Sequence, residues 1–162
     1  MGVNWTYNGK EVTTLSDIPD GVEHFVYLIT DENGKEYIGK KQIMSKRNVE
    51  VSEAVYRKLK AEGHPVTKTK NKKKSKKGKI VWRWKKKVVS ENKWQKYTGS
   101  SVLLNSEIKK GLKYKKEILH FCKTKKQATY FELREQFCRG VIEREGFWNE
   151  NIMSRFFRKD LE

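Results

Sequence analysis

The stretch HFVYLITDENGKEYIG, residues 24–39, decides the fold. Its first seven residues are mostly β-branched or aromatic, which is typical of a strand. The DENG segment at 31–34 then supplies turn residues, and KEYIG at 35–39 resumes an extended pattern. Two strands joined by so short a connection pair antiparallel, so this stretch predicts a β-hairpin.

Two tyrosines of this hairpin can converge. Tyr27 lies at the centre of the first predicted strand and Tyr37 near the end of the second, so both point to one face if the turn sets that register. Gly39 follows shortly and permits a sharp turn or the close approach of a ligand. Aromatic pairs across strands are also ordinary packing, so a structural and a functional interpretation both stay open.

The N-terminal segment predicts a second, smaller hairpin. Asn8 and Gly9 stand between two short extended runs, and this dipeptide favours a tight type I′ turn. We therefore expect residues 1–22 to form an N-terminal extension and residues 23–162 to form a single domain.

Apolar periodicity further along the chain predicts an α+β domain. Helices are expected at 45–62, at 100–111 and from 124 to about 145, and another strand at 114–122. Ser100 or Ser101 can cap the second of these helices, and Thr124 has the spacing to cap the third. The sum is a small three-stranded antiparallel sheet flanked by helices, with a basic insertion at about 63–93.

Positive charge is concentrated in this insertion. The chain of 162 residues has 37 Lys and Arg against 20 Asp and Glu, a formal net charge of +17. Residues 66–89 contain eleven Lys and Arg83 with no acid, which places +12 in one segment. Like charges repel one another, so residues 67–79 predict a mobile loop or arm and a negative partner. A solvated face that only aids solubility is the alternative.

Nucleic acid is the partner that this segment favours. Trp82, Trp84 and Trp94 follow the lysines closely, so cations stand beside flat surfaces on which bases can stack. The alternation around Trp82 and Trp84 fits a half-buried strand equally well, so core packing is an equal alternative. The basic side chains expected to contact duplex DNA are Lys40, Lys41, Lys72, Lys73, Lys74, Lys76, Lys77, Arg83, Lys85 and Lys86.

Other classes of protein are excluded by what the sequence lacks. The longest apolar run has five residues, at 25–29, whereas about 20 are needed to cross a bilayer, so no membrane span is expected. Residues 1–16 lack the apolar core of a signal peptide. Cys122 and Cys138 are too few for a disulfide scaffold or a zinc ribbon, which predicts reduced thiols in a cytoplasm.

FVY at 25–27 and YIG at 37–39, read together with Arg47, resemble the motifs of the GIY-YIG nuclease family. The resemblance implies that the two motifs lie on neighbouring strands, that Arg47 follows on the next helix, and that a later helix carries a glutamate that holds a divalent metal. Glu132 fits that glutamate, and Asn149 matches an asparagine near the end of the family core.

The resemblance covers residues 24 to about 152 and is strongest to small phage-encoded members. Those members share a W-x-x-Y-x-G-S-S stretch like the one at 94–101. Phe25 stands where the first motif has glycine, and the spacer between Tyr27 and Tyr37 is slightly short.

The resemblance also implies roles in phosphodiester hydrolysis. Glu132 would bind Mg²⁺ or Mn²⁺, which prefers oxygen ligands and stabilises the leaving oxygen. The planar fork of Arg47 would hold the scissile phosphate. Tyr27 is the expected general base and Tyr37 its hydrogen-bonding partner, and the two can exchange roles. Asn149 completes the catalytic set.

The sequence therefore predicts a metal-dependent DNA endonuclease of the GIY-YIG type, encoded by a phage and acting in the cytoplasm of the host. The alternative is a non-catalytic nucleic-acid-binding protein that uses the Lys-rich arm and the tryptophans. Oligomeric state stays open.

Overall fold

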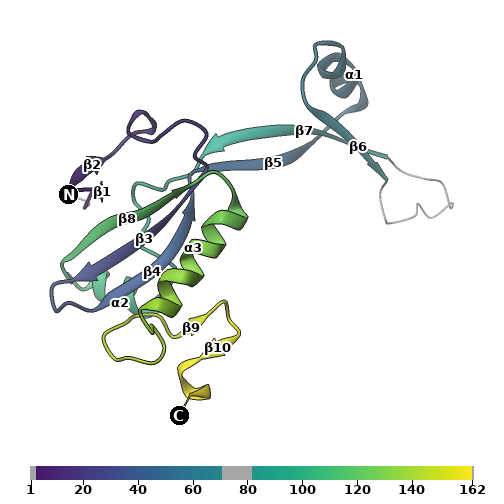
Figure 1. Ribbon diagram of the computed structural model, residues 1–162. Coiled ribbons are helices and arrows are strands. Elements are labelled where there is room, and N and C mark those ends of the chain that lie inside the picture. The colour runs from purple at the N-terminus through teal and green to yellow at the C-terminus, as the bar shows by residue number, and fades with distance from the viewer. Residues whose placement is uncertain (1–2, 71–81, 162) are drawn as a thin grey trace. The chain divides into compact units, whose positions relative to one another are not determined.

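The computed structural model describes residues 3–70 and 82–161, which fall into two compact units (Figure 1). The core unit comprises Met1–Ile43 and Asn92–Glu162, and the insertion unit comprises Met44–Glu91. The predicted α+β class is confirmed. The insertion is wider than the predicted 63–93, because the chain already leaves the core sheet after Ile43.

The described part of the core unit is built on a five-stranded sheet in the order β2-β1-β8-β3-β4. Within it, β3 pairs antiparallel with both β4 and β8, which gives the three antiparallel strands that the sequence predicted. The strands are β1 (Trp5–Tyr7), β2 (Lys10–Val12), β3 (His24–Asp31), β4 (Glu36–Gln42) and β8 (Tyr114–Cys122).

The N-terminal hairpin, predicted within an extension at residues 1–22, adds to this sheet. Its turn is as predicted, with φ of 48° at Asn8 and 77° at Gly9. The first strand, β1, then adds parallel to β8. Trp5 is fully buried and its indole N–H donates to the carbonyl of Trp94 at 2.9 Å, so the hairpin is part of the core.

Helix α3 (Lys125–Cys138) covers one face of the sheet (Figure 1). Thr124 caps it as predicted, its side chain accepting from the backbone N–H of Gln127. The helix ends well before residue 145 because Gly140 adopts a left-handed conformation with φ of 60°. The N–H groups of Gly140 and Val141 then close the last turn on Phe137 and Gln136, the pattern of a Schellman motif.

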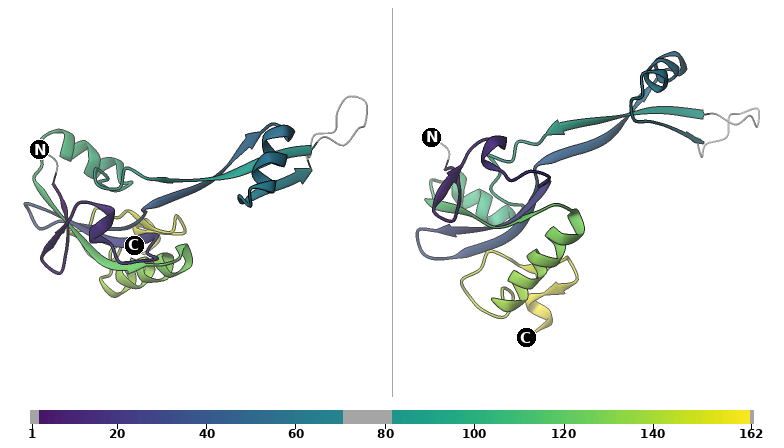
Figure 2. Two further views of the ribbon diagram at one scale, coloured as in Figure 1. Left: turned by 90° about the horizontal axis from the view of Figure 1, so that it is seen from above. Right: turned by 45° about the horizontal axis from the view of Figure 1, so that its top comes forward.

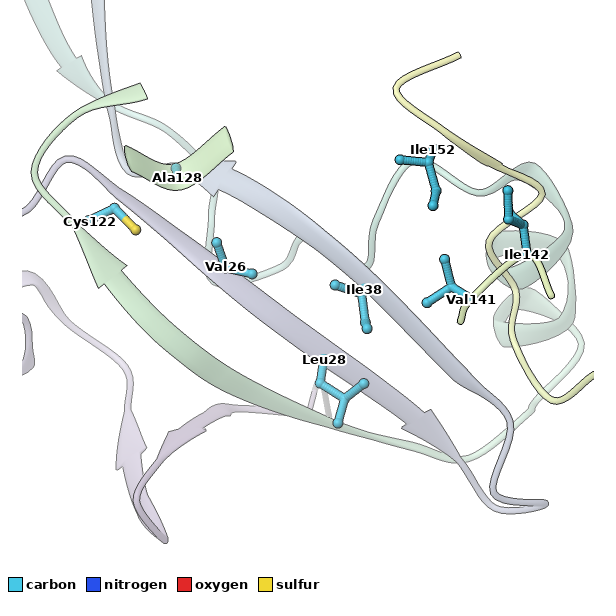
Figure 3. Packing of buried hydrophobic residues seen from close by; sticks show 8 residues of the cluster. All are labelled: Val26, Leu28, Ile38, Cys122, Ala128, Val141, Ile142 and Ile152. Carbon is cyan, nitrogen blue, oxygen red and sulfur yellow. The ribbon is translucent and has the colours of Figure 1, made fainter. Parts of the chain in front are cut away.

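An aliphatic core forms beneath α3 (Figure 3). Alternate residues of β3 and β4 point to this face, and residues after α3 close it from the side. Its buried members are Val26, Leu28, Ile38, Cys122, Ala128, Val141, Ile142 and Ile152.

The opposite face of the sheet is aromatic. The rings of Trp5, Phe25 and Tyr27 meet edge to face at 5.1–6.0 Å, and Trp94 joins them from the segment that precedes α2. Helix α2 (Val102–Lys109) begins as predicted, with the Ser101 side chain accepting from the N–H of Leu104.

A buried lysine lies within this aromatic face. Lys116 on β8 is 2% exposed, and its Nζ lies 4.6 Å from the ring of Trp5. The ammonium donates to the carbonyl of Gln95 at 2.6 Å and so fixes the residue after Trp94. Burial lowers the pKa of Lys116 from 10.5 to about 8, because desolvation disfavours the charged form.

The remaining short elements of the core unit lie near the chain ends. They are the 3-10 helices η1 (Leu15–Asp17) and η2 (Arg158–Asp160) and the two-residue strands β9 (Asn151–Ile152) and β10 (Phe156–Phe157).

The described part of the insertion unit consists of a three-stranded antiparallel sheet and one helix. Its strand order is β5-β7-β6, so β7 is central. The elements are β5 (Met44–Val51), α1 (Glu53–Ala61), β6 (Val66–Lys70) and β7 (Trp82–Glu91).

Two predictions about this unit were wrong. The helix predicted at 45–62 is a strand up to Val51, and only the residues after the Ser52 cap are helical. Cross-strand pairing with β7 overrides the local helical spacing. The loop predicted at 67–79 begins as strand β6, and its part at 71–79 lies outside the described residues.

Both ends of the insertion meet at one point of the core unit. The backbone N–H of Asn92 donates to the carbonyl of Ile43 at 2.8 Å, and the Asn92 side chain donates to the carbonyl of Gln42 at 3.0 Å. The chain therefore leaves and re-enters the core through adjacent, hydrogen-bonded residues.

The buried Lys116 predicts a pH dependence of stability. The folded chain releases this proton near pH 8 and the unfolded chain near 10.5, so the unfolded state binds more protons between these values. We expect the free energy of unfolding to rise by about 2 kcal/mol from pH 7.5 to 9.5 relative to Lys116→Met. Urea unfolding at the two pH values measures this difference, with the exposed neighbour Lys115→Met as control. Parallel pH profiles of wild type and Lys116→Met would contradict the assignment.

Candidate active site

A pocket that carries chemically active side chains lies at the outer edge of β4. It has a volume of about 450 Å³ and is predominantly polar. Because β4 is the last strand of the core sheet, side chains from both of its faces reach this pocket. Among the lining residues are Tyr37, Lys40, Ser100, Glu132, Gln136, Asn149 and Glu150.

The two motif tyrosines lie side by side, as the hairpin predicted. Tyr27 pairs with Gly39 and Tyr37 with Ile29, which places both rings on the aromatic face with their centroids 6.2 Å apart. Tyr27 is completely enclosed, whereas Tyr37 lines the pocket. The two phenols therefore have different access to a substrate.

Two glycines permit this arrangement. A Cβ atom at Gly39 would collide with the hydroxyl of Tyr27. Gly99 has φ of 93°, and a Cβ there would lie 2.7 Å from Cε1 of Tyr37. Any side chain at either position would push one of the two rings out of place.

A third tyrosine joins the pair, and the sequence analysis missed it as a site residue. The ring of Tyr97 stands perpendicular to that of Tyr27 at 6.0 Å, and the two phenols are hydrogen-bonded. Tyr97 also hydrogen-bonds to Ser100, whose Oγ lies 2.9 Å from the hydroxyl of Tyr37. Four hydroxyls thus form a chain from the buried Tyr27 to the pocket.

The signal for Tyr97 and Ser100 was present in the stretch at 94–101. Trp94 is fully buried and anchors this stretch, and Gly99 allows the turn that brings Ser100 to Tyr37. Tyr97 and Ser100 lie three residues apart with Gly99 between them, and this pattern was sufficient reason to predict both as site residues.

Burial sets the protonation of the inner phenols. Desolvation, reinforced by the neighbouring Tyr37 and Tyr97, raises the pKa of Tyr27 well above 10. Desolvation also raises the pKa of Tyr97. Both phenols are therefore protonated at neutral pH, and Tyr27 donates its hydrogen bond to Tyr97.

The predicted metal ligand Glu132 projects from α3 into the pocket, where it forms an ion pair with Lys40. Lys40 comes from β4, directly after Gly39, and points to the same face as Val26. Over residues 3–70 and 82–161, Lys40 is the pocket's only cationic lining residue. Glu132 and Lys40 thus place opposite charges beside Tyr37.

The donor set fits a metal held by a single protein carboxylate. The described residues contain no group of three His, Cys, Asp or Glu side chains arranged to hold a metal ion. Glu132 is partly buried and faces a polar pocket with room for water and phosphate oxygens. Mg²⁺ commonly keeps several waters and takes one or two carboxylates plus substrate phosphate, which this geometry allows.

Asn149 lies in the pocket wall, where its amide pairs with the edge of β4. Its Oδ1 accepts from the N–H of Ile38 at 3.0 Å, and its Nδ2 donates to the carbonyl of Ile38 at 2.9 Å. Gln136 from α3 donates to the same carbonyl at 3.2 Å. Both polar ends of the Asn149 side chain thus hold the strand that carries Tyr37 and Lys40.

Arg47 has a different setting from the one predicted. It lies on strand β5 of the insertion unit, where its side chain is exposed, and not on a helix. The predicted helix is absent there because residues 44–51 pair with β7 along their whole length.

The residues predicted to bind DNA are in varied environments. Lys41 lies 4.0 Å above the ring of Tyr97, and burial lowers its pKa. Arg83 forms an ion pair with Glu50 at 3.6 Å. Lys85 and Lys86, adjacent on β7, point to opposite faces of the insertion sheet. The predicted contacts Lys72, Lys73, Lys74, Lys76 and Lys77 lie outside the described residues.

Comparison with known proteins identifies a family whose model matches most of the chain. The model of one protein family, described as "Putative endonuclease segE, GIY-YIG domain", matches residues 5–152. No match was found among curated proteins or among solved structures. None of the helices in the described part of the chain is long and apolar enough to span a membrane.

The family match begins at Trp5, so it includes the N-terminal hairpin that the structure places in the core sheet. It also runs through both tyrosine motifs, the insertion and Glu132, and ends just past Asn149. A match over this much of the chain, together with the paired tyrosines and the pocket glutamate, shows that the chain belongs to the GIY-YIG nuclease family, of the segE type.

Proposed function

We propose that this protein is a metal-dependent endonuclease, encoded by a phage, that hydrolyses phosphodiester bonds in duplex DNA. The observation that carries the proposal is the meeting of Tyr37, Lys40 and Glu132 in one polar pocket at the edge of β4. These side chains supply a proton acceptor, a cation for phosphate and an oxygen ligand for a metal.

Glu132 is the residue that would hold Mg²⁺ or Mn²⁺. When bound, such an ion supplies Lewis-acid stabilisation of charge on the phosphate and on the leaving oxygen. Lys40 neutralises Glu132 in the protein alone, and its position in the pocket suits it to contact a phosphate oxygen once the carboxylate has another cation.

Tyr37 is the better proposed general base of the two motif tyrosines. It borders the pocket directly, whereas Tyr27 is buried behind it with a raised pKa. In this scheme Tyr37 acts as a phenolate, the form that the Lys40 ammonium and a bound metal ion would favour, and its oxygen receives the proton of the attacking water. Tyr27, Tyr97 and Ser100 orient the Tyr37 ring and its hydroxyl through packing and hydrogen bonds.

Arg47 and Asn149 complete the proposal with supporting roles. Arg47 is a proposed phosphate ligand presented by strand β5, since its guanidinium is exposed. Asn149 positions β4 from the pocket wall through its two hydrogen bonds to Ile38.

The first test concerns Glu132. Purified protein should nick or linearise plasmid DNA with Mg²⁺ and lose this activity in EDTA. We expect Glu132→Gln to slow cleavage by at least about 100-fold, because the metal loses its protein ligand. Binding to DNA in EDTA should change by less than about threefold.

Glu143→Gln, a substitution at an exposed position outside the pocket lining, is the matched control. Equal cleavage by wild type and Glu132→Gln would refute the site. A wild type that binds DNA without ever cutting it would instead favour the non-catalytic nucleic-acid-binding alternative.

The second test separates the two tyrosines. Tyr37→Phe removes the proposed base and should lower the single-turnover cleavage rate by about 10²–10⁴-fold. Tyr27→Phe removes only a hydrogen bond to Tyr97 and should have a clearly smaller effect on the rate. Thermal unfolding of both variants reports whether each one folds. A larger loss in a folded Tyr27→Phe would reverse the assignment.

A further inference from the structure

The described part of the insertion unit has no fully enclosed interior of its own. None of the described residues in Met44–Glu91 is buried. The sequence of this unit contains 17 Lys and Arg against four Glu. A sheet with so little core and so much positive charge is suited to contact with a polyanion. Its two faces differ in what they present.

One face of the insertion sheet is occupied by α1. Tyr56 of α1 stacks on Trp84 of β7 with ring centroids 4.6 Å apart, and Trp84 pairs with Val51 and Lys68 on the adjacent strands. Directly opposed residues share a face, and alternate residues along a strand return to it. Trp82 and Trp84 therefore both belong to the helix-covered face.

The outer sheet face points away from α1 (Figure 2). On the central strand β7 it presents Arg83, Lys85 and Lys87, spaced by about 7 Å from one to the next. The strand register adds neighbours with hydrogen-bonding side chains on both sides of this row. They are Lys46 and Asn48 on β5 and Thr67 and Thr69 on β6.

The acidic side chains on this face leave the row of cations positive. Glu50, opposite Lys85, is engaged with Arg83 at 3.6 Å, and Glu91 lies at the far end of β7. Hydroxyl, amide and cationic groups around one strand are the groups that hold phosphate oxygens. The row thus has the charge and the donors that a nucleic-acid backbone requires.

We propose that the outer sheet face binds the phosphate backbone of the DNA duplex, and that Lys85 and Lys87 are its central contacts. This inference rests on the proposed function for the choice of DNA. A duplex is favoured over a single strand because the described residues of this face include no aromatic side chain on which unpaired bases could stack. Trp82 and Trp84 lie on the other face.

The test compares two charge-matched double variants. Lys85→Gln/Lys87→Gln neutralises the outer sheet face, and Lys58→Gln/Lys60→Gln removes the same charge from exposed positions of α1. Binding to a duplex of about 30 base pairs is measured in EDTA at several salt concentrations. We expect the first variant to bind about tenfold more weakly and its salt dependence to lose about two units of slope.

The second variant should bind within about twofold of wild type. Equal effects of the two variants would overturn the proposal, since diffuse charge would then explain binding. Tighter binding of wild type to a single strand than to the duplex would overturn it as well.

Protection of wild-type lysines supplies a measurement that no misfolding can affect. An amine-reactive reagent should modify Lys85 and Lys87 less when duplex DNA is present, and modification of Lys58 and Lys60 should stay unchanged. Uniform protection of all four would contradict the proposal.

Binding and cutting are separable in this design. A wild type that binds through Lys85 and Lys87 but does not cut with Mg²⁺ would refute the proposed function and leave this inference standing. A wild type that cuts while both double variants bind alike would refute this inference alone.

Discussion

The structure depends on how the edge of β4 is closed. The last strand of a sheet carries backbone groups with no neighbouring strand, and these need other partners. Here the side chains of Asn149 and Gln136 serve Ile38, while the backbone of Gly146 and Trp148 serves Glu36. The edge of β4 is thus closed by side chains at Ile38 and by backbone groups at Glu36.

This closure leaves room for a pocket where a further strand would lie. Tyr37 and Lys40, on opposite faces of the same edge strand, both border it, and Glu132 reaches it from α3. On the aromatic side, glycine at two positions lets the tyrosine rings approach the backbone closely. The geometry of the pocket therefore depends on the lack of a side chain at Gly39 and Gly99 as well as on the side chains that line it.

The sequence was most informative where local chemistry determines structure. The Asn8-Gly9 turn, the Ser101 and Thr124 caps and the tyrosine hairpin follow from interactions within a few residues, and all are found as predicted. Strand β5 was missed because its face alternation is masked by polar residues and its order comes from pairing with β7. The clamp by Asn149 on Ile38 joins residues 111 positions apart, which no local pattern reveals.

The candidate active site also combines residues that the sequence identified with contacts that only the fold reveals. Tyr27, Tyr37 and Glu132 were recognised because motifs single them out, whereas the ion pair of Lys40 with Glu132 and the hydrogen bond of Tyr97 with Tyr27 form only when folding brings these partners together. The early end of α3 at Gly140 was readable in principle, because a glycine after a helical run is a common stop signal.

The hydrogen bond between Ile43 and Asn92 joins the two points at which the insertion unit leaves and re-enters the core unit. Closing a loop costs little conformational entropy when its two ends already lie together. The two segments of the core unit can therefore pair without the 48 residues that separate them in the sequence. None of the described residues that line the pocket belongs to the insertion unit. The proposed DNA-binding face and the proposed catalytic pocket are thus formed by different units of the chain.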